Sequence, residues 1–434
     1  MERVELGRRL GVEGRADGHR DVIIDESQPV RFMEAFRSAV AGGGTVFVMD
    51  PSWGAVEREQ FSALVRFPGA GLQSPSAGSQ SQTAPARSEI GGRKSEIDHG
   101  WLCLPTGGSS GALRLARHDQ DTMAAAVHGC REHFRADRID AVGVLPLHHV
   151  SGLMAWMRCA LTGGRYVPWD WADLEDGRWP QTGAGNWFIS LVPTQLQRLL
   201  DRPDAAERLR RFRAVLVGGG PAWPDLLDRA ADARLPLAPV YGMTETAAMV
   251  AALRPEEFLT GRRGCGEALP HARLQLGGNS TIQIHAESLF RGYFPGWREV
   301  GGFWTADDLG HLDEHGGLHV LGRRDTVIIS GGEKTDPAEV EAVLRATGQF
   351  ADVVVVGVPD AEWGSVVVAC YPAGTRMPDL AAIARCLTCE LAPHKRPRQY
   401  LPIAWPRNTQ GKINRQAVTA LASAAVRAPR PNSG

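Results

Sequence analysis

The chain has 434 residues, of which 43% are hydrophobic, and a formal net charge of -1. This length favours two or more domains, and the near-zero charge gives no electrostatic case for binding nucleic acid or an anionic membrane. No apolar run approaches a membrane span, the first ten residues are too charged for a signal peptide, and the seven scattered cysteines indicate reduced thiols, so we expect a cytoplasmic protein with small-molecule partners.

The N-terminal part of the chain has the pattern of ordinary α/β structure. A helical pattern over Pro29–Val40 is followed by a glycine break and a strand over Thr45–Met49. From residue 68 to residue 100 the composition shifts to Ser, Gln, Gly and Pro. Because this stretch has too few apolar residues to pack, it predicts a mobile surface segment.

An apolar run then breaks into glycines and hydroxyls and ends at a cation. Glycines let the backbone approach an anion, while N–H groups and hydroxyls donate hydrogen bonds. The composition is typical of a phosphate-binding loop, although a Gly/Ser turn after a strand is more often only a turn, and no Gly-Lys-Ser/Thr closes it as in a Walker loop. The candidate phosphate-binding residues are Thr106, Gly107, Gly108, Ser109, Ser110, Gly111 and Arg114.

Beyond this loop one unit recurs, consisting of an apolar strand, a glycine or polar turn, and a helix. The expected helices are His118–Phe134 and Leu196–Leu200, and the expected strands are Ala141–Leu145, Asn186–Val192, Ala214–Val217 and Leu237–Val240. This alternation predicts an α/β fold with a mainly parallel sheet, whose ligands lie at the C-terminal ends of the strands.

The pattern changes after residue 264. Short alternating segments, typical of a small antiparallel β unit, occur at Arg273–Leu276, Thr281–His285 and Leu318–Leu321. A mixed α+β region follows, with expected helices at Pro337–Ala346 and Leu380–Leu391 and expected strands at Val353–Val358 and Ser365–Tyr371. We therefore expect a large domain over residues 1–324 and a small C-terminal domain over residues 325–434.

Five separated motifs, in their order and spacing, resemble those of the AMP-forming ligase superfamily. They are the loop at 106–114, Tyr241-Gly-Met-Thr-Glu245, Asp308-Leu-Gly, Gly322-Arg-Arg-Asp325 with Ser330-Gly-Gly332, and Asn408-Thr-Gln-Gly-Lys412. The resemblance spans almost the whole chain and implies an acyl-CoA synthetase-like fold with a mobile C-terminal lid domain.

Four further segments look most like those of the o-succinylbenzoate:CoA ligase family of menaquinone and phylloquinone biosynthesis. They are Pro146–Gly152, Val192–Leu196, Gly218–Pro221 and Ile328–Glu333. The resemblance implies that ATP and Mg²⁺ activate o-succinylbenzoate as an acyl-AMP, which then passes to coenzyme A. The alternatives are a ligase for another aromatic acid or a fatty acid, and a non-catalytic nucleotide-binding homologue.

The resemblance also implies roles for the nucleotide-binding residues. Glu245 would hold Mg²⁺ and Thr244 would contact the α-phosphate, whereas a strand-end helix cap is the plain structural interpretation of the pair. Asp308 would bind the ribose hydroxyls, with Asp307 as the alternative. The remaining nucleotide-binding candidates are Tyr241, Gly242, Gly218, Gly219, Gly220 and Arg323. Family members usually end the phosphate loop with Pro-Lys, whereas this chain has Leu113-Arg114, and an arginine fork differs in geometry from an ammonium group.

Lys412 matches the mobile catalytic lysine of the superfamily, which would bridge the substrate carboxylate and the α-phosphate. A lone Gly-Lys in a polar loop is otherwise usually a solvated surface lysine. The candidates for the hinge and the coenzyme A channel are Asp325, Ser330, Gly331, Gly332 and Lys395. For the acid, the candidates are His149, Ser151, Thr194, Gln195 and Arg198, and His149 is equally well explained as a structural imidazole. The sequence leaves a homodimer open.

Overall fold

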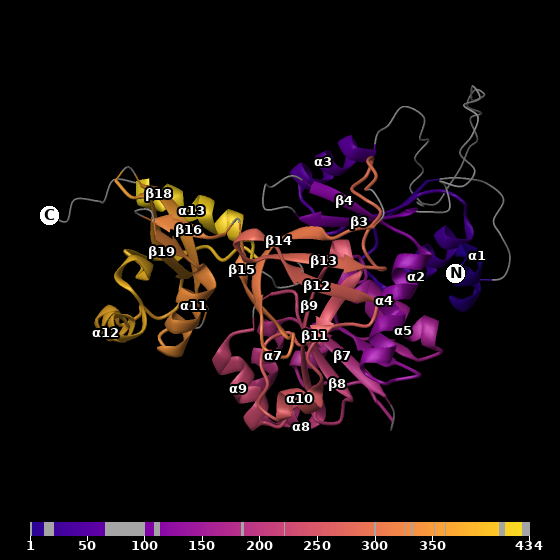
Figure 1. Cartoon of the computed structure of the whole chain (residues 1–434), viewed down its shortest axis with the longest axis horizontal. Coiled ribbons are helices and arrows are strands. Elements are labelled where there is room, and N and C mark those ends of the chain that lie inside the picture. Colours follow the sequence, from indigo (N-terminus) through magenta and orange to yellow (C-terminus); the bar gives the residue numbers. More distant parts are fainter. Residues whose placement is uncertain are drawn as a thin grey trace.

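The computed structural model describes residues 2–12, 21–65, 100–107, 113–183, 186–220, 222–298, 301–324, 326–330, 333–350, 352–360, 362–407 and 413–427. A large body contains the indigo to salmon elements, and a smaller orange to yellow body lies beside its strands β14 and β15 (Figure 1). Within these ranges, no helix is both long enough and apolar enough to cross a membrane.

The first sheet has four strands in the order β1-β2-β3-β4. Its elements are β1 (Val22–Ile24), β2 (Val46–Val48), β3 (Leu102–Gly107) and β4 (Leu113–His118), with helices α1 (Arg3–Arg9), α2 (Pro29–Ala41) and α3 (Ala55–Val65). The first three strands run parallel, whereas β3 and β4 are antiparallel. The predicted phosphate loop therefore connects two antiparallel strands, and Thr106 pairs with Arg114 in the register.

Aromatic packing fixes α5 (Val150–Thr162) against this sheet. Phe36 of α2 is fully buried, and its ring lies 6.2 Å from the ring of Trp101 and 5.5 Å from that of Trp156. Complete burial of such a side chain contributes about 1.5–3 kcal/mol. Because Trp156 belongs to α5, this contact positions the helix that begins immediately after His149.

The second sheet has seven strands in the order β11-β10-β9-β8-β7-β5-β6. The strands are β5 (Asp140–Gly143), β6 (Tyr166–Pro168), β7 (Trp187–Leu191), β8 (Ala214–Val217), β9 (Leu237–Met243), β10 (Ala248–Ala252) and β11 (Glu267–Ala268). The helices are α4 (Gln120–His133), α5, α6 (Trp171–Glu175), α7 (Pro193–Leu200), α8 (Pro203–Leu209), α9 (Pro224–Asp232) and α10 (Pro255–Leu259). Strands β5 to β9 pair in parallel, and β10 and β11 add an antiparallel edge. The predicted mainly parallel sheet is confirmed.

A third, antiparallel sheet completes the large body. Its strands are β12 (Ala272–Leu276), β13 (Thr281–Ala286), β14 (Trp304–Leu312) and β15 (Leu318–Arg323). The predicted antiparallel unit is confirmed, but the sequence analysis missed β14. Residues 306–308 overlap a family motif but give no strand signal, because two consecutive acidic side chains, Asp307 and Asp308, hide the alternation of a strand.

The smaller body is α+β. Its strands are β16 (Ile328–Ser330), β17 (Glu333–Thr335), β18 (Val354–Asp360), β19 (Gly364–Pro372) and β20 (Gln399–Ile403), and its helices are α11 (Pro337–Ala346), α12 (Leu380–Glu390) and α13 (Arg415–Arg427). Its contact with the large body includes the guanidinium of Arg345, which lies 4.8 Å from the ring of Trp223. The predicted elements of this region are confirmed, and the division at residues 324/325 stays a prediction.

Candidate active site

Glu245 lies in a short turn between two strands of the second sheet. The turn, Thr244–Thr246, follows β9 and leads into β10. A Cβ atom at Gly242 would lie 2.0 Å from the carbonyl oxygen of Ala248, so β9 and β10 can approach this closely only because residue 242 is glycine. Glu245 is 5% exposed, and a buried carboxylate requires donors or a cation.

Two hydroxyl groups supply those donors to a single oxygen of Glu245. Thr106 Oγ1 donates to Glu245 Oε1 at 3.1 Å, and the Tyr293 hydroxyl donates to the same oxygen at 2.7 Å. Neither of these bonds uses the second carboxylate oxygen, Oε2, which keeps its capacity to accept. That oxygen is therefore the one suited to a hard cation such as Mg²⁺.

A cation and a half-buried phenol complete the cluster around Glu245. The guanidinium of Arg114 lies 4.5 Å from the ring centre of Tyr293. Burial, together with the charge of Glu245, raises the pKa of Tyr293 well above its ordinary range, so the phenol stays protonated as a donor. The structure thus brings Thr106, Arg114 and Glu245 together, as the motifs predicted. Sequence reasoning missed Tyr293, because nothing in its local pattern distinguishes it from a packing aromatic.

The backbone of Thr244 is held by a buried histidine. His118 Nε2 lies 2.7 Å from the Thr244 carbonyl oxygen, and His118 Nδ1 lies 3.1 Å from Thr122 Oγ1. Burial lowers the pKa of His118 to about 4, so the imidazole is neutral at physiological pH. His118 therefore anchors the turn that carries Thr244 and Glu245 without adding charge.

Tyr241 and the two aspartates of β14 form a second polar group. The Tyr241 hydroxyl donates to Asp308 Oδ2 at 2.8 Å, and Asp308 pairs with Arg323 across β14 and β15. Asp307 instead accepts a hydrogen bond from Arg324 at 2.9 Å and lies 3.7 Å from Arg323. Because neighbouring strand residues point to opposite faces, Asp308 and not Asp307 shares the face of Tyr241.

The predicted nucleotide-binding glycines 218–220 follow β8. A Cβ atom at Gly218 would lie 2.6 Å from Val240 Cγ2, and Gly219 has a φ of +77°, which favours glycine at both positions. Gly220 is exposed. The contacts of these glycines and of Tyr241 with a nucleotide stay predictions.

His149 lies at the start of α5, beside a second histidine and an aspartate. His149 Nε2 is 3.5 Å from Asp50 Oδ2, and His148 Nε2 is 3.4 Å from Asp50 Oδ1. Burial opposes ionisation of Asp50, but hydrogen bonds from Ser52 and the nearby imidazoles bring its pKa below the ordinary value. Ser151 lies in the first turn of the same helix. Sequence reasoning missed Asp50, which follows a different strand, β2.

The other predicted acid-binding residues lie on α7, where two of them have structural partners. Gln195 Oε1 accepts a hydrogen bond from the Val192 N–H at 3.0 Å and so caps the helix. Arg198 is half-exposed and lies 3.0 Å from Glu175. Thr194 is partly buried in the first turn. Their roles toward an acid stay predictions.

Arg158 is a buried cation that the sequence analysis did not single out. It lies on α5 and is 5% exposed, and its guanidinium lies 3.5 Å from Ser190 Oγ. No carboxylate of the described residues lies within ion-pair distance of it. Buried charges normally have a charged partner, so this guanidinium is suited to an anionic ligand. An arginine within the apolar sequence of α5 was the available signal.

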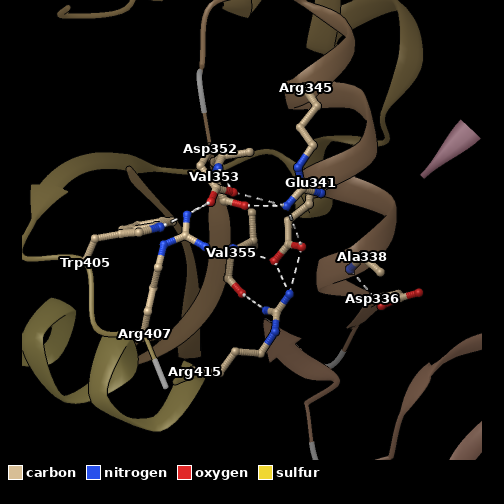
Figure 2. Close-up of polar contacts among 10 residues, drawn as sticks. All are labelled: Asp336, Ala338, Glu341, Arg345, Asp352, Val353, Val355, Trp405, Arg407 and Arg415. Atoms are coloured by element: carbon tan, nitrogen blue, oxygen red, sulfur yellow. Dashed lines mark hydrogen bonds and ion pairs between the residues drawn. The ribbon is translucent and has the colours of Figure 1, made fainter. Parts of the chain in front are cut away.

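Arginine–carboxylate pairs hold both ends of the segment that contains Lys412 (Figure 2). Arg407 binds Asp352 at 2.7 Å, and Arg415 donates to both oxygens of Glu341 at 2.6 and 2.7 Å. Arg407 and Ile413 form an antiparallel bridge. Arg407 and Ile413 therefore lie side by side, and Arg407 and Arg415 bind residues at the start of β18 and on α11.

Several predicted site residues lie outside the described part of the chain. They are Gly108, Ser109, Ser110, Gly111, Asp325, Gly331, Gly332 and Lys412. Of the other hinge and coenzyme A candidates, Ser330 is buried at the end of β16, and Lys395 binds Glu339 at 2.7 Å.

Comparison with family models supports this organisation. The model described as AMP-binding enzyme matches residues 74–294, just over half of the chain, and the model described as AMP-binding enzyme C-terminal domain matches residues 339–412. The 2-succinylbenzoate–CoA ligase of Geobacillus kaustophilus is 33% identical over 330 residues, covering 71% of this chain and 63% of that protein. The Enterococcus faecalis ligase of the same name is 32% identical, covering 71% of this chain and 67% of that protein. The chain thus spans just under two thirds of the first of these relatives.

Solved structures share the fold over nearly the whole chain. The o-succinylbenzoate CoA synthetase from Bacillus subtilis, in complex with the acyl-adenylate OSB-AMP, superposes with a TM-score of 0.74 at 24% identity, covering 96% of this chain and 92% of that one. ATP-bound MatB from Rhodopseudomonas palustris gives a TM-score of 0.74 at 21% identity, with the same coverage. The predicted fold, a large α/β domain followed by a small C-terminal domain, is confirmed.

Proposed function

This chain belongs to the AMP-binding enzyme family, and from that premise we propose that it joins a carboxylic acid to coenzyme A through an acyl adenylate, with o-succinylbenzoate as the acid. In the first step a carboxylate oxygen attacks the α-phosphorus of ATP and pyrophosphate leaves. In the second step the thiolate of coenzyme A attacks the acyl carbon and AMP leaves. The carboxylate oxygen alone is a poor leaving group, whereas AMP, once joined to the acid in the first step, is a good one.

The observation that carries the proposal is the cluster around Glu245. Residues from β3, β4 and the turn after β9 place a hydroxyl, a guanidinium and a buried carboxylate where the two ends of the predicted phosphate loop meet. Bound through Glu245 Oε2, Mg²⁺ would neutralise phosphate charge. Arg114 and the donors of the loop would hold the departing phosphates, since phosphoryl transfer depends mainly on positioning and charge neutralisation.

Asp308 and Arg323 support the nucleotide side of the proposal. The carboxylate of Asp308 is held by Tyr241 at 2.8 Å and can accept hydrogen bonds from both ribose hydroxyls. Lys412 would bridge the acid and the α-phosphate as negative charge develops.

Arg158 supports an acid with two carboxylates. o-Succinylbenzoate has one carboxylate to be activated and a second that would pair with a buried guanidinium. A fatty acid or a simple benzoate would leave Arg158 without an anion, so these acids are the second candidates. A non-catalytic nucleotide-binding homologue is the remaining alternative, and it predicts no exchange of pyrophosphate into ATP with any acid.

The test measures pyrophosphate release and thioester formation with o-succinylbenzoate, benzoate and a fatty acid. We expect o-succinylbenzoate to give the highest kcat/KM; the proposed acid is wrong if a monocarboxylic acid exceeds it, and the ligase activity is wrong if no acid reacts. Lys412→Ala should abolish adenylate formation but spare thioester formation from supplied adenylate. Lys395→Ala, also in the small domain, should spare adenylate formation but reduce thioester formation from supplied adenylate. Equal loss of both half-reactions in Lys412→Ala would refute its role.

A further inference from the structure

Asp50, His148 and His149 form a compact group of potential metal ligands that the proposed reaction does not use as a unit. Asp50 follows β2 of the first sheet, whereas the two histidines lie between β5 of the second sheet and α5. One carboxylate oxygen and the two imidazole nitrogens all lie within 4.8 Å of one another. Among the described residues, this is the one group of three or more such side chains with that spacing.

The distances suit a single small cation. Nε2 of His148 and of His149 lie 3.4 and 3.5 Å from the two oxygens of Asp50. A tetrahedral ion bound at about 2.1 Å separates neighbouring ligand atoms by about 3.4 Å. Each histidine nitrogen therefore lies at about that spacing from an oxygen of Asp50, and one ligand atom from each of the three residues lies within 4.8 Å of the others.

Burial and hydrogen bonding hold the group in place. Asp50 and His148 are each 5% exposed, and Ser52 donates to Asp50 Oδ1 through its N–H at 2.9 Å and its hydroxyl at 2.7 Å. His148 Nε2 is buried and makes no hydrogen bond to a described residue. Such fixed orientation of ligand side chains is typical of metal sites, whereas a buried imidazole nitrogen without a hydrogen bond is otherwise unfavourable.

We propose that Asp50, His148 and His149 bind one divalent transition-metal ion of the Zn²⁺ class. Two imidazoles and one carboxylate suit Zn²⁺, Co²⁺ or Ni²⁺, whereas Mg²⁺ prefers oxygen ligands, so this site is distinct from the one assigned to Glu245. Three protein ligands leave a fourth position open for water or for an oxygen of a bound acid. The side chain of His149 is 20% exposed, so the group is accessible from solvent through this residue.

A second histidine pair provides a matched control. His319 Nε2 also lies 3.4 Å from a carboxylate, that of Asp313, and its ring stacks on His311 at 4.6 Å. These residues do not form a three-ligand group. His319→Gln therefore removes a histidine with the same carboxylate distance without removing a proposed metal ligand.

The test titrates the chelator-treated full chain with Co²⁺ and Zn²⁺ in buffer that contains Mg²⁺ but no ATP. Cys386 and Cys389, which are partly exposed and exposed on α12, are replaced by serine so that their thiols do not bind the metal. We expect one equivalent of Co²⁺ with the visible absorption of a tetrahedral site, and displacement of Co²⁺ by Zn²⁺. His148→Gln and Asp50→Asn should each weaken binding at least about tenfold, and His319→Gln should not.

Circular dichroism establishes that each variant is folded; if Asp50→Asn is not, His149→Gln replaces it, because its side chain is partly exposed. In the chain with Cys386 and Cys389 replaced but Asp50, His148 and His149 intact, the melting temperature should rise with Zn²⁺ concentration, a measurement that requires no ligand variant to fold. Absence of tight binding, or equal weakening by His319→Gln, overturns the metal site. Because none of these measurements uses ATP or an acid, they are independent of whether the chain is a ligase.

Discussion

Replacing Glu341 by glutamine should destabilise the small body by about 3 kcal/mol. Glu341 is 1% exposed. It accepts two hydrogen bonds from Arg415 and one from the Val355 N–H at 2.8 Å, and it lies 3.5 Å from Arg345 (Figure 2). Glutamine keeps the size of the side chain but removes its charge and directs an NH₂ group toward the arginines.

The magnitude follows from the burial of the pair. Removing one partner of a buried ion pair costs about 3–5 kcal/mol, because the other charge stays desolvated. The Arg415 side chain is 34% exposed, so solvent screens part of this loss and the lower end of the range applies. The bond from Val355 can survive, since the amide oxygen of glutamine also accepts.

Glu339→Gln is the matched control on the same helix. Its two oxygens accept from Lys395 at 2.7 Å, but its side chain is 42% exposed. An exposed pair of this kind contributes about 0–1 kcal/mol. The two variants therefore make the same chemical change in a buried and an exposed ion pair.

Hydrogen exchange measured by mass spectrometry is the suitable assay, because two bodies need not unfold in one step. In Glu341→Gln, amides of β18 and the start of α13 should exchange about 100-fold faster, the equivalent of about 3 kcal/mol. Amides of β8 in the large body should be unchanged. Equal exchange in the Glu341 and Glu339 variants would refute the reasoning that burial makes this pair strong.

Three further outcomes are expected. Tyr293→Phe removes a hydrogen bond to the Glu245 carboxylate, worth about 1.5–3 kcal/mol, and should raise the Mg²⁺ concentration needed for half-maximal adenylation about tenfold; an unchanged Mg²⁺ dependence would count against it. Arg158→Met should raise KM for o-succinylbenzoate about 10- to 100-fold with little change in KM for ATP, whereas Arg229→Met, at the partner of Asp201, should change neither. Because the folded-state pKa of His118 is about 4 and the ordinary value is about 6.5, the unfolded chain binds the extra proton first. The contribution of neutral His118 to the stability of the folded chain is complete above pH 6.5. It is lost as the pH falls toward 4, by up to about 3 kcal/mol. The melting temperatures of the wild type and of His118→Gln should therefore converge over that interval.

Much of the fold could be predicted from the sequence, because its signals are local. The strand Ala214–Val217 was predicted with the bounds that the structure has, since a short apolar run ending in glycines has few other interpretations. The helix Pro29–Val40 differs by one residue from α2. Strand β14, one of those not predicted, carries acidic side chains, so the local pattern of polar and apolar residues does not show which face of the strand is covered.

The candidate site was predicted only in part. The motifs placed Thr106, Arg114 and Glu245 in one site, and the structure brings these side chains together. The partners Tyr293 and Asp50 carry no local signal, since each acts on a residue far along the chain. For the acid, the sequence drew attention to Gln195 and Arg198, whereas the structure gives both of them local partners.

The sequence by itself determined the order of strands and helices and the family motifs, because periodicity, glycine and charge act over a few neighbouring residues. Only the tertiary structure decided which carboxylate of the pair 307 and 308 shares a face with Tyr241, because that choice depends on the pairing of β14 with β15. It also decided that Asp50 meets His148 and His149, since two sheets must pack before the ends of their strands lie together.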